Sequence, residues 1–153
     1  MEIASLLQVR HQTDVPGRVG VVPGQTYQPL IGVPDRMTER VRLGRATYGP
    51  GTLEPLHWHP IEALYYVVSG AATVRNVAGA AFEVDAGAFI YAPPGLAGAH
   101  EWEARESLEL LDIRATTDAH RKMQFTVDRA TLRSYIDVDE LAKREGISFP
   151  SHY

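Results

Sequence analysis

Two histidines, His57 and His59, open a run of β-branched and aromatic residues that ends at Ser69 and Gly70. Successive side chains of a β-strand point to opposite faces, so residues two apart share a face. We therefore expect His57 and His59 to lie side by side, where two imidazoles can hold one divalent cation. The alternative is a pair of ordinary polar residues near the start of a strand. A third histidine, His100, follows a later turn and favours the metal site.

Short segments of strand-like sequence, separated by turns with Gly and Pro, follow one another through the middle of the chain. The expected strands cover residues 39–48, 64–68, 71–75, 81–85, 88–92 and 108–115. Short strands at this spacing are typical of an all-β sandwich or barrel. Residues 25–40, which include Pro29 and Pro34, are expected to form an irregular lead-in, and residues 2–9 fit either a short strand or a helical turn.

The C-terminal part of the chain has a different pattern. Asp137 and Glu140 have the spacing of a helix capping box, and Gly146 is a helix stop signal, so a short helix is expected between them. We expect one domain over residues 1–153. Its barrel spans about residues 40–115, between an N-terminal lead-in and a C-terminal helical appendage.

Composition excludes several classes of protein. The 153-residue chain is 44% hydrophobic, which suits one domain with a real core rather than a disordered chain. It has no cysteine, so disulfides, thiolate metal sites and cysteine nucleophiles are excluded. A net charge of -4 argues against a nucleic-acid surface. The sequence shows neither a long apolar run nor a signal peptide, so we expect no membrane partner and a cytoplasmic location.

Two motifs in the chain resemble those of the cupins, a family of small metal-binding jelly-roll β-barrels. The first cupin motif, G-x5-H-x-H-x3,4-E-x6-G, is matched in every spacing but has alanine in place of glutamate. Its positions here are Gly51, His57, His59, Ala63 and Gly70. The second, G-x5-P-x-G-x2-H, begins with Gly87, Pro93 and Gly95, but has Gly98 at the usual histidine position and His100 two residues later.

The resemblance implies an all-β, single-domain cupin jelly-roll with His57, His59 and His100 as metal ligands. Three ways of filling the position left by Ala63 are open. Glu62 could reach the metal if Pro60 set a β-bulge, Glu101 and Glu103 flank His100 with the wrong parity, and a neutral three-histidine site with water is the favoured choice. Three imidazoles suit a divalent transition metal: Fe(II) is favoured, with Zn, Ni, Mn or Cu as alternatives.

Further candidate site residues are inferred from the strand face on which each is expected to lie. Glu62 and Tyr65 are candidate catalytic groups, and Arg45, Trp102 and Tyr91 are candidates for the substrate pocket. Arg45 is expected on the inner face, where its guanidinium would suit a carboxylate or an enolate. Trp102, which shares parity with His100, would close the pocket against a flat substrate. Core packing or surface exposure is the alternative for each of them.

The chain also resembles cupin dioxygenases that lack the motif glutamate, such as acetylacetone dioxygenase. That resemblance implies a non-haem iron dioxygenase that uses O₂ on a small diketone, hydroxy-acid or phenolic substrate. A non-redox metal-dependent cyclase or isomerase is the first alternative, and a non-catalytic barrel that binds a small ligand is the second. Cupins commonly pair through sheet edges, so a homodimer is expected.

Overall fold

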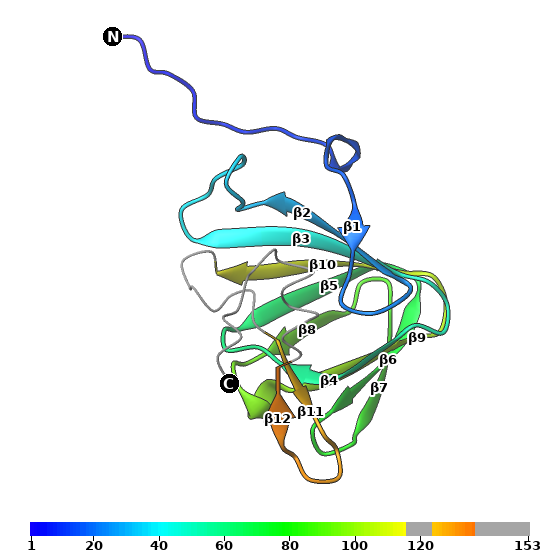
Figure 1. Cartoon of the computed structure of the whole chain (residues 1–153). Helices are drawn as coiled ribbons and strands as arrows, with labels where there is room; N and C mark the ends of the chain where they lie inside the picture. The colour runs from blue at the N-terminus through cyan, green and yellow to red at the C-terminus, as the bar shows by residue number, and fades with distance from the viewer. Residues whose placement is uncertain (116–123, 137–153) are drawn as a thin grey trace, which may run out of the picture.

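The computed structural model describes residues 1–115 and 124–136, which form two antiparallel sheets packed face to face (Figure 1). The first sheet has the strand order β1-β2-β3-β10-β5-β8 and the second the order β12-β11-β4-β9-β6-β7. The strands are β1 (Arg18–Val19), β2 (Gln25–Ile31), β3 (Val41–Tyr48), β4 (Leu53–Trp58), β5 (Ala63–Ser69), β6 (Ala71–Asn76), β7 (Ala81–Asp85), β8 (Phe89–Ala92), β9 (His100–Ala104), β10 (Leu108–Ala115), β11 (Phe125–Val127) and β12 (Ser134–Tyr135). Two 3-10 turns, η1 (Gln12–Asp14) and η2 (Leu96–Gly98), complete the described secondary structure. The expected all-β fold is confirmed.

Alternation of side chains along the strands builds the core between the two sheets. In β5, Ala63, Tyr65 and Val67 are buried while the residues between them are exposed. In β10, Leu108 and Leu110 point inward in the same way. Burial of these apolar side chains supplies most of the free energy that holds the sheets together. The core cluster consists of Ala46, Tyr48, Ala63, Tyr65, Val67, Ala72, Val74, Ala92, Trp102, Ala104, Leu108 and Leu110.

The expected irregular lead-in at residues 25–40 is partly wrong, because residues 25–31 form strand β2. Pro29 lies in this strand opposite Gly44, next to a register shift that falls between Pro29 and Ile31. The neighbouring β1 covers only Thr26 and Tyr27. Among the described residues, no strand therefore lies beside Pro29 on the side of β2 away from β3, and proline is tolerated at such edge positions.

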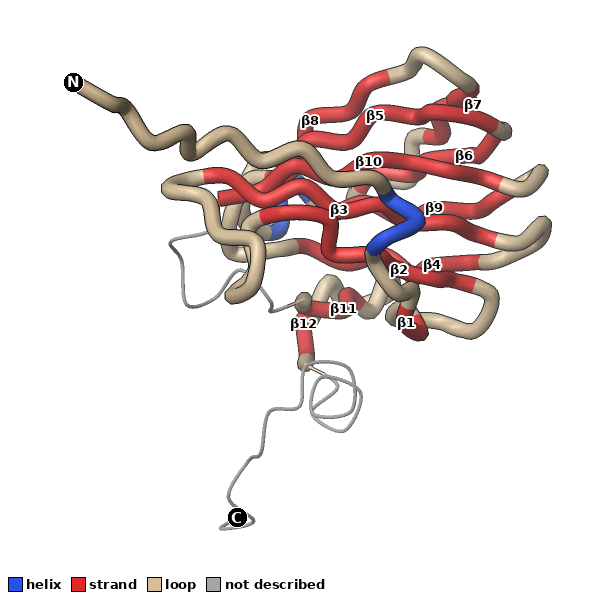
Figure 2. The backbone as a smooth tube through the Cα atoms, turned by 90° about the horizontal axis from the view of Figure 1, so that it is seen from above, coloured by secondary structure: helices blue, strands red, loops and turns tan. Residues whose placement is uncertain are grey.

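The two ends of the chain differ from the middle. Residues 1–11 form neither strand nor helix and extend beyond the strands as an arm (Figure 2). The helix expected over residues 137–146 lies outside the described residues. Within the described ranges, no helix is long and apolar enough to cross a membrane.

Candidate metal centre

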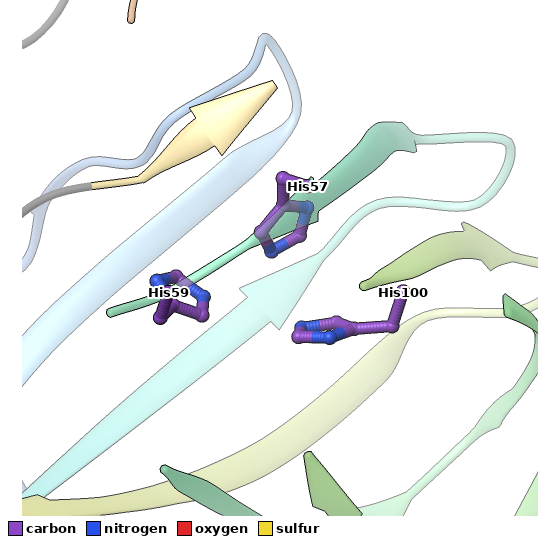
Figure 3. Close-up of side chains that lie close together, drawn as sticks. All are labelled: His57, His59 and His100. Atoms are coloured by element: carbon purple, nitrogen blue, oxygen red, sulfur yellow. The ribbon is translucent and has the colours of Figure 1, made fainter. Parts of the chain in front are cut away.

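Three histidine side chains converge inside the barrel, near one end of the second sheet (Figure 3). His57 lies in β4, His59 directly follows it, and His100 begins β9, the strand that pairs with β4. Each has a ligating nitrogen within 4.8 Å of those of the other two. All three residues are buried, with exposed fractions of 2%, 4% and 4%. This cluster could hold a metal ion.

Backbone carbonyls orient two of the three rings. The carbonyl oxygen of Pro55 lies 2.7 Å from Nδ1 of His57, and that of Gly98 lies 2.8 Å from Nδ1 of His100. A carbonyl only accepts, so Nδ1–H donates and the lone pair of each neutral ring is on Nε2. Burial, followed by the nearby His57, lowers the pKa of His100 to about 3. His100 is therefore neutral at pH 7, the form that ligates a metal.

The third ring, His59, contacts an arginine that the sequence reasoning missed. Nη1 of Arg114 lies 3.2 Å from Nδ1 of His59. A guanidinium has no acceptor, so Nδ1 of His59 accepts and the proton of the neutral ring is on Nε2. For Nε2 of His59 to ligate a metal, the proton of the neutral ring would have to lie on Nδ1 instead, and Nδ1 could then no longer accept from Arg114. The chemistry of the donor set fits a divalent transition metal.

A β-bulge brings a carboxylate, Glu54, to the inner face beside the histidines. Glu54 precedes His57 by three residues, so in a regular strand the two would face opposite sides. The register between β4 and β9 shifts between Glu54 and His57, and both side chains are buried. Oε1 of Glu54 lies 3.7 Å from Nε2 of His57, and Oε2 accepts a hydrogen bond from Tyr48 at 2.7 Å. Pro55 was the available signal, because proline within a strand marks bulges and edges.

Neither the motif position nor its neighbours place a carboxylate in the cluster. Ala63 points inward and is 1% exposed. Glu62 is exposed and accepts a hydrogen bond from the hydroxyl of Tyr91 at 3.0 Å, so both of these candidates lie away from the histidines. Glu101 and Glu103 form ion pairs with Arg75 instead. A bulge at Pro60 was the condition for Glu62 to reach the metal, and the register shift in this region lies earlier in the chain, between Glu54 and His57.

Tyr65 is the sequence-predicted candidate that the structure brings to the histidines. Its hydroxyl lies 3.1 Å from Nε2 of His100 and 3.5 Å from Nε2 of His59. It also accepts a hydrogen bond from Nη2 of Arg114 at 3.1 Å. Burial raises the pKa of Tyr65 well above its ordinary value, so this hydroxyl keeps its proton at neutral pH.

The two other pocket candidates lie elsewhere. Trp102 is 1% exposed and packs edge-to-face against Tyr65 in the core, with ring centroids 5.5 Å apart. Arg45 lies on the outer face, where Nε donates to Glu109 at 2.8 Å. The expected inward orientation of Arg45 is wrong, because the inward residues of β3 are the ones that alternate with it, among them Arg42 and Ala46.

A cavity of about 70 Å³ adjoins His59, one of the three histidines. His59, Tyr65, Glu54 and Arg114 are among the residues that line it, together with Arg18, Gly20, Val21, Gln25, Tyr27, Arg42, Ala46, Tyr48, Leu110, Asp112 and Gln124. The sequence reasoning missed the charged members of this set. A signal was present in β10, where Asp112 and Arg114 continue the inward alternation of Leu108 and Leu110.

Comparisons with known proteins agree with this fold. The cupin domain family matches residues 44–114. The polyketide cyclase RemF from Streptomyces resistomycificus superposes with a TM-score of 0.69 at 23% identity, over 92% of this chain and 94% of that one. KdgF from Halomonas sp. has a TM-score of 0.60 at 19% identity, over 71% and 93% of the two chains.

A dioxygenase is among the similar structures as well. The salicylate 1,2-dioxygenase from Pseudoaminobacter salicylatoxidans, solved as a point mutant in complex with gentisate, has a TM-score of 0.56 at 15% identity, over 63% of this chain and 26% of that one. No curated protein sequence matches the chain. The matched domain and the paired sheets lead to one assignment: residues 44–114 match the cupin domain, and the described residues have the cupin fold.

Proposed function

We propose that this protein is an enzyme that uses a divalent transition metal on a small-molecule substrate. The observation that carries the proposal is the cluster of His57, His59 and His100 inside a barrel, next to a cavity with polar groups. A metal bound there would act as a Lewis acid and polarise a substrate oxygen. The surrounding core would exclude water and strengthen electrostatic contacts inside the cavity.

Proton-transfer chemistry, as in a cyclase or an isomerase, is the first candidate reaction. The Tyr65 hydroxyl carries a proton at neutral pH and lies within 3.5 Å of two of the histidines. The Arg114 guanidinium, which donates to that hydroxyl, is placed to stabilise negative charge that develops on a substrate oxygen. The similarity to RemF over nearly the whole of both chains also favours this class. Zn(II) or Ni(II) suits this non-redox reaction.

A dioxygenase reaction is the second candidate. The observation that favours it is the absence of a carboxylate from the cluster among the described residues, because Ala63 replaces the glutamate of the motif. A three-histidine face is the arrangement of the cupin dioxygenases that the sequence resembles. Fe(II) bound there would supply the redox chemistry, with O₂ as co-substrate and a diketone, hydroxy acid or phenol as substrate.

The first experiment measures the metal content of the purified protein, and then O₂ uptake after anaerobic loading with Fe(II) and turnover after loading with Zn(II) or Ni(II). Fe(II)-dependent O₂ uptake with a diketone or phenolic acid would assign the dioxygenase reaction. Product formation with Zn(II) or Ni(II) and no O₂ uptake would assign the proton-transfer reaction. A protein that takes up none of the three metals would contradict the proposal and leave a ligand-binding barrel.

Single substitutions test which residues hold the metal. We expect His57→Ala and His100→Ala to abolish stoichiometric metal binding, because each removes one of three neutral donors. Glu62→Ala is the matched control and should keep one metal per chain, since Glu62 is exposed and contacts Tyr91. The measurement is elemental analysis of each purified variant after dialysis. A metal-free Glu62→Ala variant would contradict the three-histidine site.

We further propose that the protein forms a homodimer through the outer face of the first sheet, where exposed apolar residues gather on β5 and β8. A cytoplasmic location stays a prediction from the sequence.

A further inference from the structure

Positive charge exceeds negative charge around the cavity beside His59. The described residues that line it include three arginines, Arg18, Arg42 and Arg114, but only two carboxylates, Glu54 and Asp112. His59, which also lines the cavity, is neutral or positive and so does not reduce this excess of positive charge. A divalent cation on the histidine cluster would increase it. Such a cavity attracts anions and disfavours cations.

Two of these arginines lie directly opposite one another. Arg42 of β3 is the register partner of Arg114 of β10, and both line the cavity from the inner face of the first sheet. Like charges at directly opposed positions of neighbouring strands destabilise a sheet. An anion between the two guanidinium groups would remove this cost.

Each of these two guanidinium groups also has a buried donor without an acceptor. Within the described part of the chain, Nε of Arg42 and Nε of Arg114 have no hydrogen-bond partner, although both atoms are shielded from water. Arg42 is only 7% exposed. A buried N–H that lacks an acceptor is costly, so its presence beside a cavity points to a ligand that supplies the acceptor.

The two carboxylates of the cavity are already engaged by other groups. Asp112 accepts from the hydroxyl of Tyr27 at 3.2 Å and pairs with Nη2 of Arg114 at 3.4 Å. Glu54 accepts from Tyr48 at 2.7 Å and from Gln124 at 3.3 Å. Neither carboxylate supplies an acceptor to the two Nε atoms.

We propose that the substrate of this enzyme is a small carboxylic acid whose carboxylate binds between Arg42 and Arg114. The planar guanidinium offers Nε–H and Nη–H as a fork that matches the two oxygens of a carboxylate. Arg114 contacts both His59 and Tyr65, so a carboxylate held there places the rest of the molecule toward the histidine cluster. This inference rests on the proposed function, because it names the substrate class of the same site.

The test measures anion binding to the metal-free protein, so that it does not depend on metal chemistry. Benzoate and propionate are titrated by NMR against benzamide and propionamide, which have similar shapes but no charge. We expect saturable binding of the carboxylates and at least tenfold weaker binding of the amides. Equal binding of acid and amide would overturn the proposal, and tighter binding of inorganic phosphate than of both carboxylates would overturn the assignment to carboxylic acids.

Three variants locate the binding site. Arg42→Gln should weaken benzoate binding at least tenfold, and Arg114→Lys, which keeps the charge but loses the fork, should weaken it as well. Arg45→Gln is the matched control, because Arg45 lies on the same strand as Arg42 but on the outer face. Unchanged benzoate affinity in folded Arg42→Gln would overturn the proposal. Metal content of the purified wild type, measured before the metal is removed, tests the proposed function separately, because a protein without bound metal would contradict that function and leave the carboxylate site unaffected.

Discussion

Glu54 is a buried carboxylate that lies near His57 in both sequence and space, yet it is outside the group of three metal-binding candidates. A negative charge a few ångströms from a divalent cation stabilises that cation even without ligating it. At the scale of single residues, we therefore expect the affinity for a metal at the three histidines to depend on Glu54 as well.

Glu54→Gln tests this dependence, because the amide keeps the size of the side chain and removes its charge. We expect metal binding to weaken about tenfold, the lower end of the range for groups that support metal ligands. Competition with a chromogenic chelator gives the affinity. Glu62→Gln is the control and should bind metal like the wild type; an equal loss in both variants would show that only overall charge matters.

The Arg45–Glu109 ion pair provides a pH-dependent prediction on the outer face. The hydrogen bond from Arg45 lowers the pKa of Glu109 below its ordinary value. A lowered carboxyl pKa stabilises the fold above the pKa of the unfolded chain, and this contribution is lost as the pH falls through the folded pKa.

We therefore expect Arg45→Gln to raise the pKa of Glu109, as measured by NMR titration of its side-chain carboxyl carbon. The cost in free energy of unfolding at pH 7 should be under about 1 kcal/mol, because the pair is partly exposed. This cost should vanish in strong acid. A pKa of Glu109 that is the same in variant and wild type would contradict the role of the ion pair.

Residue type and spacing explain which site residues the sequence could predict. His57 and His59 share a short strand segment, and His100 falls in a second motif, so local pattern was sufficient for all three. Arg42 and Arg114 are far apart in the chain and meet only because β3 and β10 pair, a register that no local pattern gives. The inward orientation of Glu54 could not be predicted from strand alternation, because the bulge at Pro55 interrupts that alternation.

Among the elements, the turn η2 before β9 fixes the position of His100. A Cβ added at Gly98 would lie 1.8 Å from the carbonyl oxygen of Pro93, a backbone atom that cannot move aside easily. The carbonyl oxygen of Gly98 itself orients the His100 ring. This explains why the usual histidine position of the second motif holds glycine here: a side chain at position 98 would overlap the backbone of Pro93.

Gly98→Ala should therefore displace the turn and misplace His100. We expect a loss of about 1–3 kcal/mol in the free energy of unfolding, typical of overpacking, together with weaker metal binding. Urea denaturation and chelator competition measure the two effects. Gly17→Ala is the control, because the nearest atom to an added Cβ there is 3.9 Å away. Wild-type metal affinity in Gly98→Ala would contradict the role assigned to this turn.

Strand alternation allowed most of the elements to be predicted, including those expected over residues 39–48, 71–75 and 108–115. The missed strand β2 contains a proline and lies near an edge of its sheet, so its sequence has the signals of a loop. The short β11 and β12 depend on contacts with β4, such as the stacking of Phe125 on Trp58 at 4.0 Å. Tertiary contacts of this kind leave no periodic pattern.

At the scale of the whole molecule, the outer face of the first sheet is unusually apolar near the edge strand β8. Leu64 and Tyr66 of β5 pair in register with Tyr91 and Phe89 of β8, and all four are exposed, Phe89 by 81%. Contiguous apolar surface and an uncovered sheet edge are both features that a partner commonly covers. The second copy of the chain that we propose would cover both at once.

We expect the protein to be a dimer by light scattering coupled to size exclusion, and Tyr66→Lys with Phe89→Glu to be a folded monomer. Met37→Lys alters an exposed apolar residue in the loop between β2 and β3 and should stay dimeric. A monomeric wild type at micromolar concentration would contradict the homodimer.

The Tyr65 hydroxyl is held by one sheet and meets His100 of the other, with Trp102 of the second sheet packed against its ring. The distance from this hydroxyl to His100 therefore depends on the spacing of the two sheets. The volume of the core residues determines that spacing. The core residues thus set the separation of the two side chains: we expect trimming of Trp102 to alter the distance between the Tyr65 hydroxyl and His100 without changing either of those two residues.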